Sequence, residues 1–176
     1  MKLSMHARRL FVTFVLVLGG TAALSGPASA ATKAPITQAK TIHLFQQVVS
    51  RKILNGHGRL VSAHSNLTSG FKLTATYHEY LGNHAHHGAR ATGSGSMTCV
   101  FTSTTNALCT AQVSVEGSSV LANRVPVDFS SQPVNIAVNG GTGAFNDVHG
   151  LLLATSVGRS GSADVTVIVA PRPPGP

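Results

Sequence analysis

The chain is poor in acidic residues, in cysteines and, beyond residue 30, in helical periodicity. Its 176 residues include only 5 Asp and Glu and only 2 Cys, against 13 Lys and Arg. After residue 30 the basic residues are dispersed, and the Arg51-Lys52 pair is their longest run. A nucleic-acid-binding surface needs a basic patch or stripe, so the sequence predicts no nucleic-acid partner.

Several motifs of catalysis and cofactor binding are missing as well. The sequence has no G-x-S-x-G nucleophile elbow, and two cysteines alone are a poor basis for a zinc site. The G-G-T-G run at 140–143 is not followed by the Gly-Lys-Ser/Thr and helix that a phosphate-binding loop requires. We therefore expect no cofactor, and we interpret these glycines as part of a turn.

The first 30 residues have the pattern of a signal peptide. A basic start precedes an apolar run from Leu10 to Leu24, and Ala28-Ser29-Ala30 has the small-x-small form of a cleavage site. The apolar run is shorter than the roughly 20 residues that a membrane span needs. We expect export with cleavage after Ala30 and no membrane association afterwards. The Arg8-Arg9 pair leaves the route open between the general and the twin-arginine pathway.

Cleavage would leave a chain that is long enough for one hydrophobic core. Three basic residues would be lost, so 10 Lys and Arg would remain against 5 Asp and Glu, a net charge of +5 with His neutral. We predict a flexible leader at 31–40, a single domain at 41–170, and a proline-rich disordered tail at 171–176.

The region from 41 to 170 alternates apolar and polar residues in short segments that are separated by turn signals. We predict strands at 41–50, 59–63, 71–80, on both sides of a polar turn at 103–106, and at 120–129, 134–138, 151–157 and 163–170. This pattern is typical of an antiparallel barrel or sandwich. A barrel of about eight strands would remove the exposed edges that short strands otherwise create.

The two cysteines flank the predicted turn at 103–106. Cys99 and Cys109 have the parity to lie opposite each other on one face of a hairpin. In an oxidising compartment such a pair normally forms a disulfide. Closing so short a loop would stabilise the fold by about 3 kcal/mol in the chain-entropy treatment.

The strand at 71–80 supplies the candidate site residues. Phe71, Tyr77 and Glu79 share its apolar face, and Phe101 has the same phase on the neighbouring predicted strand. We predict that the three aromatic residues line a ligand-binding lumen. A carboxyl group in an apolar lumen would have a raised pKa suited to proton transfer, so Glu79 is the candidate catalytic residue. The alternatives are that the aromatics simply fill the core and that Glu79 lies in water at the end of the strand.

A histidine-rich loop follows this strand. His78, His84, His86 and His87 fall in or beside the segment 82–94, which lacks large apolar residues and is predicted to be a mobile hairpin loop. Imidazoles two residues apart on an extended chain face the same way and could share a metal ion. Because no cysteine and only one carboxylate are close by, we expect a polar, partly protonatable loop and no specific metal site.

The segment Ala137–Gly150 reads as a sharp reversal between two apolar runs. It resembles small exported bacterial members of the allene oxide cyclase and dirigent barrel superfamily, whose signature is an apolar strand, G-G-T-G, an aromatic residue and a later glycine. The residues that carry the resemblance are Gly140, Gly141, Thr142, Gly143, Phe145 and Gly150, with Cys99 and Cys109 in support. It implies an eight-stranded antiparallel barrel with an apolar lumen, in which relatives hold a reactive or flexible small molecule while it cyclises or couples stereoselectively.

Two classes of function remain open. The first is an exported binder of an apolar small molecule, with or without an isomerase or cyclase activity. The second is a non-catalytic scaffold or interaction protein. A polar group pointing into an open lumen would favour the first class, and a lumen packed shut would favour the second.

Overall fold

Ten strands and one short 3-10 turn make up the described part of this all-β protein. The computed structural model describes residues 33–62 and 66–173, so the predicted signal peptide lies outside the described residues. No helix in these two ranges is long and apolar enough to cross a membrane. The elements are β1 (Lys40–Leu54), β2 (Leu60–Val61), β3 (Lys72–Leu81), β4 (Gly93–Phe101), β5 (Asn106–Val115), β6 (Ser118–Asp128), β7 (Val134–Val138), β8 (Gly140–Thr142), η1 (Gly143–Phe145), β9 (Val148–Val157) and β10 (Ser162–Pro171).

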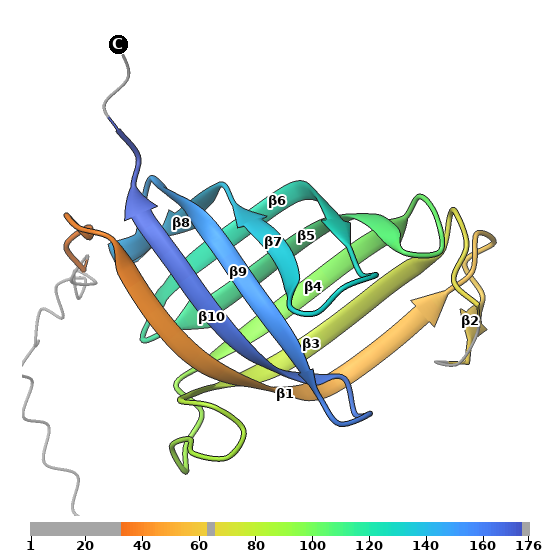
Figure 1. Ribbon diagram of the computed structural model, residues 1–176, viewed down its shortest axis with the longest axis horizontal. Coiled ribbons are helices and arrows are strands. Elements are labelled where there is room, and N and C mark those ends of the chain that lie inside the picture. The colour runs from red at the N-terminus through yellow and green to blue at the C-terminus, as the bar shows by residue number, and fades with distance from the viewer. Residues whose placement is uncertain (1–32, 63–65, 174–176) are drawn as a thin grey trace, which may run out of the picture. The chain divides into compact units, whose positions relative to one another are not determined.

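The strands form one antiparallel sheet that curls into a barrel (Figure 1). Their order is β7-β9-β10-β1-β3-β4-β5-β6-β8, and the short β2 pairs only with the far end of β1. The two ends of this order, β7 and β8, are consecutive in the chain and are separated by Asn139 alone. They are therefore two halves of one broken strand, whose first half pairs with β9 and whose second half pairs with β6. The predicted antiparallel barrel is confirmed, with eight positions around its ring.

Asn139 joins the ring where the strand breaks. No ladder pairs β6 with β7, although the two strands lie side by side (Figure 1). Instead the Asn139 N–H donates to the Leu121 carbonyl at 3.0 Å. The Asn139 side chain accepts from the Asn123 N–H at 2.8 Å and donates to the Asn123 carbonyl at 2.9 Å. One residue, through its backbone N–H and its side chain, thus supplies hydrogen bonds that a backbone ladder would otherwise make.

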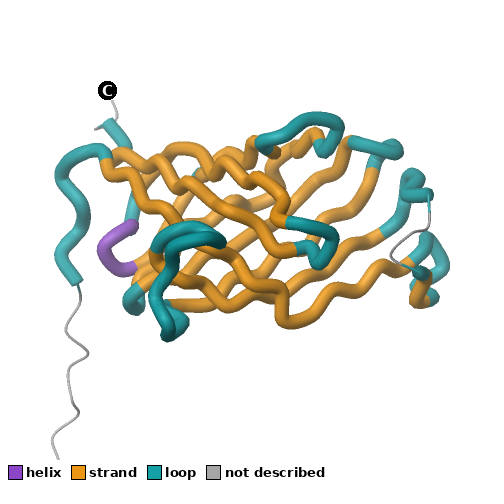
Figure 2. Tube along the Cα trace, turned by 60° about the horizontal axis from the view of Figure 1, so that its bottom comes forward, coloured by secondary structure: helices purple, strands orange, loops and turns teal. Residues whose placement is uncertain are grey.

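The interior is packed at one end of the barrel. Fully buried aliphatic side chains from four strands fill this end: Leu44, Val120, Val148, Val167 and Val169. The turn η1 closes it by inserting the buried Phe145, and Figure 2 shows this turn (purple) at one end of the barrel. The segment before β1 adds a further layer, because the Ile36 N–H donates to the Ala144 carbonyl at 2.9 Å.

Strand β1 contains a bulge that changes which residues face the lumen. Its pairing with β3 shifts between Val48 and Ser50, and the bulged Val49 is 55% exposed. Before the bulge the buried Leu44 has the inward phase, whereas after it the inward residues are Arg51 and the buried Ile53. A bulge places two residues opposite one and re-aims the side chains that follow. Strict alternation from Leu44 would have turned Arg51 outward.

The predicted reversal at Ala137–Gly150 is confirmed, since β7 and β9 run antiparallel with Val138 opposite Gly150. The structure adds β8 and η1 inside this reversal. Two glycines are required by close backbone contacts. A Cβ atom on Gly141 would lie 2.1 Å from the Phe145 carbonyl oxygen, and one on Gly150 would lie 1.9 Å from the Ile168 carbonyl oxygen.

The remaining predicted strands are all present, with small shifts at their ends. Strand β1 continues past the predicted end at Ser50 to Leu54. Strand β10 includes Pro171, one residue into the predicted tail, at a terminal position where the missing N–H interrupts no ladder. Pro126 lies in β6 beyond its pairing with β8, in the stretch that pairs with β5.

Cys99 and Cys109 lie directly opposite each other in β4 and β5, are fully buried and are bonded. The predicted disulfide is confirmed. Their side chains share the inward phase of the barrel wall with Phe101. The bridge therefore holds the β4–β5 hairpin from inside the barrel.

Replacing both cysteines, Cys99→Ala with Cys109→Ala, should lower the free energy of unfolding by about 3 kcal/mol, because the unfolded chain regains the freedom of the loop. Urea unfolding of the oxidised protein and the double variant measures this difference. The reduced natural protein is the control and should match the double variant. Equal stability of the oxidised protein and the variant would contradict the prediction.

Candidate functional site

The end of the lumen opposite η1 is hollow. It contains a cavity of about 380 Å³ whose wall includes residues of β1, β3, β4, β5, β7, β9 and β10 and of the β4–β5 and β6–β7 loops. Its apolar wall includes Leu73, Ala75, Met97, Phe101, Val113, Ile136, Leu152, Ala154 and Val165. An apolar cavity of this size lies in the range of small-molecule sites. The barrel is therefore packed at one end and open at the other.

The three aromatic residues predicted to line the lumen divide into two groups. Tyr77 and Phe101 line the cavity, and the Phe101 ring lies 5.6 Å from that of Phe129, another lining residue. Phe71 is half-buried and packs against the core but does not line the cavity. Its N-terminal position explains this placement, because it lies just before β3 begins at Lys72.

Glu79 lies in the boundary between the packed and the hollow halves of the lumen. It is 0% exposed, so the alternative that it lies in water at the end of its strand is wrong. The Gln46 side chain donates from Nε2 to Glu79 Oε1 at 2.8 Å, and Oε2 has no hydrogen-bond partner in the described chain. Gly95 makes room for this carboxyl group, because a Cβ atom there would lie 2.1 Å from Oε1.

Burial dominates the electrostatics of this carboxyl group. It raises the pKa of Glu79 from 4.5 to about 7, while the hydrogen bond from Gln46 acts in the opposite direction. Glu79 does not itself line the cavity, whereas Gln46 and Tyr77 do. The predicted catalytic carboxyl group thus stands directly behind the cavity wall, with a pKa close to neutral pH.

Tyr77 lines the cavity and lies two residues before Glu79 on the same face of β3. Burial raises the pKa of Tyr77 above its usual value; the positive charge of Arg51 lowers it and the charge of Glu79 raises it. Tyr77 therefore lies within electrostatic reach of a cation on one side and a carboxyl group on the other.

Arg51 and Gln46 are the site residues that sequence reasoning missed. Both come from β1, and Arg51 is the only charged residue among the described residues that line the cavity. Apolar–polar alternation does not predict that Arg51 faces inward, because only the bulge at Val49 turns it that way. Gln46 has the phase of Ile42 and Leu44, so its inward position was readable from that alternation.

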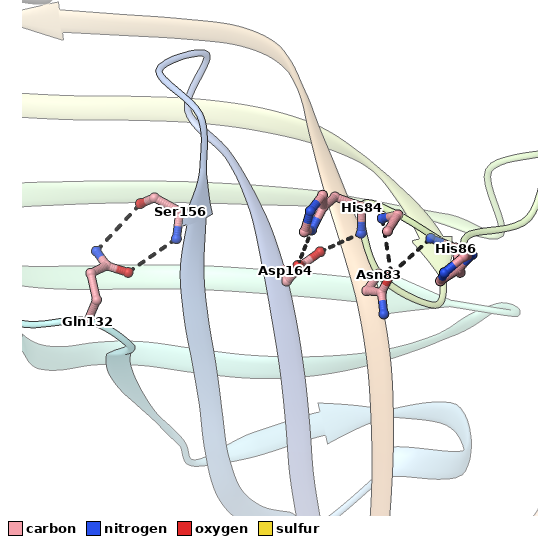
Figure 3. Close-up of polar contacts among 7 residues, drawn as sticks. Asn83, His84, His86, Gln132, Ser156 and Asp164 are labelled. Atoms are coloured by element: carbon pink, nitrogen blue, oxygen red, sulfur yellow. Dashed lines mark hydrogen bonds and ion pairs between the residues drawn. The ribbon is translucent and has the colours of Figure 1, made fainter.

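The rim of the cavity is polar. Gln132, in the β6–β7 loop, donates from Nε2 to Ser156 Oγ at 3.4 Å and accepts from the Ser156 N–H at 3.1 Å (Figure 3). Both residues line the cavity, as do Thr104 and Thr105 of the β4–β5 turn. A polar rim around an apolar interior is the usual arrangement of a ligand pocket.

The histidine-rich loop lies on the outside of the barrel. His84 bonds to the Asp164 carboxylate of β10 through both its backbone N–H and its ring nitrogen Nδ1 (Figure 3). The His87 ring lies 5.0 Å from the rings of both Phe45 and Tyr80. His86 donates its N–H to Asn83 Oδ1 at 2.8 Å. The described residues include no group of three or more His, Cys, Asp or Glu side chains placed to hold a metal ion.

No protein-family model matches the chain, and no curated protein matches it by sequence. Solved structures do match its fold. A pyocyanin demethylase superposes with a TM-score of 0.59 at 16% identity, over 74% of this chain and 100% of the other. The pterocarpan synthase dirigent protein PsPTS1 superposes with a TM-score of 0.56 at 17% identity, over 77% of this chain and 97% of the other. The pterocarpan synthase dirigent protein GePTS1 superposes with a TM-score of 0.54 at 20% identity, over 76% of this chain and 84% of the other.

At these identities the likeness shows the fold alone. The protein has the dirigent-type barrel that the glycine motif at 140–150 predicted. The matches carry no substrate or site residue to this chain.

Proposed function

We propose that this protein is an exported barrel that binds an apolar small molecule in its lumen. The observation that carries the proposal is the cavity of about 380 Å³, which is apolar inside, polar at its rim and open at the end opposite η1. The buried disulfide supports an oxidising location outside the cytoplasm. The aromatic contacts offered to a ligand are Tyr77 and Phe101.

The scaffold alternative requires a lumen filled by its own side chains. The packed half of the barrel meets that requirement, since Leu44, Val120 and Val167 are fully buried there. The hollow half does not, because small residues such as Ala75 and Ala154 face it. A protein selected only for stability would gain by filling this space. Ligand binding therefore accounts better for the hollow half.

Proton transfer by Glu79 is a second candidate function, as part of an isomerisation or cyclisation. A carboxyl group with a pKa of about 7 is close to evenly divided between its acid and base forms near neutral pH, which suits general acid–base catalysis. Its fold relatives are named as a demethylase and as synthases, so this barrel architecture is compatible with catalysis. Glu79 does not line the cavity and is hydrogen-bonded to Gln46, which does, so transfer to a ligand would require Gln46 to move aside.

A cavity-filling variant tests binding. Ala154→Phe should weaken binding of the neutral fluorescent probe N-phenylnaphthylamine by about tenfold or more, because the new ring occupies space that the probe needs. Probe titration of the folded protein, monitored by fluorescence, measures the dissociation constant. The matched control is Ala137→Phe, at an exposed position of β7 that faces away from the lumen.

Binding by Ala154→Phe and Ala137→Phe with equal affinity would place the probe outside the cavity and remove the support for the proposal. If the natural protein binds no neutral apolar probe at all, the scaffold alternative should replace it. Should a turnover be found, Glu79→Gln separates catalysis from binding, since it is expected to lower turnover and leave the affinity for the probe unchanged.

A further inference from the structure

We infer that the ligand of this lumen carries an acidic group and that Arg51 binds that group. The inference rests on the proposed function and narrows its ligand class. The ligand would be an apolar molecule with one ionised carboxylate, sulfonate or comparable oxygen acid. Its apolar body would lie against Phe101 and Leu152, and its acidic group toward Arg51.

The first observation is the bulge at Val49. Without it Arg51 would share the outward phase of Phe45 and lie on the solvent face, like other basic residues of the sheet. With it Arg51 lies opposite Ala75, whose side chain faces the cavity, and its own side chain lines the same cavity. Bulges are devices that re-aim side chains near binding and catalytic sites. Here the side chain that is re-aimed is a cation.

The second observation is that no acidic side chain of the protein neutralises Arg51. The chain has 5 acidic residues, and all of them lie in the described ranges. No ion pair joins any of them to Arg51. Four of the five are engaged elsewhere: Glu116 pairs with Lys33, Asp164 with His84, Asp147 with Arg172, and Asp128 accepts from the Ser130 N–H.

The fifth acidic residue is Glu79, which is hydrogen-bonded to Gln46 and stands behind the cavity wall. Arg51 is itself exposed, so it presents an uncompensated positive charge at the solvent-facing mouth of the apolar cavity. The arginine guanidinium is planar and always charged, and it binds carboxylates and similar oxygen acids through two parallel hydrogen bonds. Such a bond is worth more at the edge of an apolar cavity than in bulk water, because the local dielectric is lower.

The surroundings of Arg51 agree with a position that receives a ligand. Gly161, in the β9–β10 turn, lies against its stem, since a Cβ atom there would be 3.6 Å from both Cδ and Nη1 of Arg51. Gln132 and Ser156 bond to each other at the same rim. Within the described residues, the hydrogen bonds at the rim do not involve the Arg51 side chain. Its guanidinium is therefore available to a molecule in the lumen.

Two probes with the same aromatic body test the inference. N-phenylnaphthylamine is neutral, and anilinonaphthalene sulfonate carries one sulfonate. The natural protein should bind the anionic probe about tenfold tighter than the neutral one, as expected for a hydrogen-bonded charge pair. Arg51→Gln should remove this preference, so that the two probes bind with about equal affinity. Arg51→Lys should keep a smaller preference, because the charge remains and the paired hydrogen bonds are lost.

Lys52→Gln is the matched control. It removes the same charge from the adjacent residue, which is exposed and does not line the cavity. A preference that Lys52→Gln lowers as much as Arg51→Gln would reflect the overall positive charge of the protein and overturn the inference.

The outcomes also separate the inference from the proposed function. Binding of the neutral probe without any preference for the anionic one would overturn the role of Arg51 and leave the apolar binding site intact. Binding of neither probe would remove the proposed function, and the inference with it.

Discussion

Replacing Glu79 with Gln should stabilise the protein at pH 8 by about 3 kcal/mol while leaving its stability at pH 4 nearly unchanged. Burial raises the pKa of Glu79 from 4.5 to about 7 in the folded protein. Between these two values the folded state holds a proton that the unfolded state has lost, so the free energy of unfolding falls as the pH rises and levels off above pH 7. A difference of this size between the two pKa values corresponds to about 3 kcal/mol. Glutamine has no proton to lose, so the variant should lack this decline.

Urea unfolding at a series of pH values from 4 to 9 measures the effect. Glu116→Gln is the matched control, because Glu116 is exposed and pairs only with Lys33 at the surface. It should leave the shape of the pH dependence unchanged. A natural protein that is as stable at pH 8 as at pH 5 would contradict the assignment of Glu79 as a buried, largely neutral acid.

Gly150→Ala should prevent normal folding or lower the free energy of unfolding by more than about 4 kcal/mol. The new Cβ atom would lie 1.9 Å from the carbonyl oxygen of Ile168, which belongs to the backbone of the adjacent strand β10. A backbone atom in the middle of a ladder cannot move aside without breaking its own hydrogen bonds. Soluble yield and urea unfolding measure the outcome.

Gly140→Ala is the control within the same motif. A Cβ atom on Gly140 would meet nothing within 4 Å, so this variant should lose less than about 1 kcal/mol. If the two variants were equally stable, close contact with the Ile168 carbonyl could not be the reason for glycine at position 150.

The features that depend on neighbouring residues could be predicted from the sequence. Alternation located the strands, and the polar turn at 103–106 set the register that places Cys99 opposite Cys109. The glycines of 140–150 predicted a reversal for the same reason. In each case the deciding interaction is local, so the sequence pattern alone specifies it.

The features that depend on distant residues could not be predicted in this way. Alternation assigned Glu79 to the inward face, but its burial depends on how far β1 and β4 extend beside it and on the space left by Gly95. The alternation of residues 41–50 does not reveal the bulge at Val49, so the inward position of Arg51 could not be predicted. The hollow half likewise depends on small side chains that several strands contribute to the same region of the lumen, such as Ala75 and Ala154.

The break at Asn139 gives the barrel one compliant line along its wall. Everywhere else around the ring, moving two strands apart breaks a ladder of backbone hydrogen bonds. Between β6 and β7 the only obstacles are side-chain packing and the three hydrogen bonds of Asn139. Val134 and Ile136 of β7 also line the cavity, so this line of fewer backbone hydrogen bonds runs beside the hollow half of the barrel.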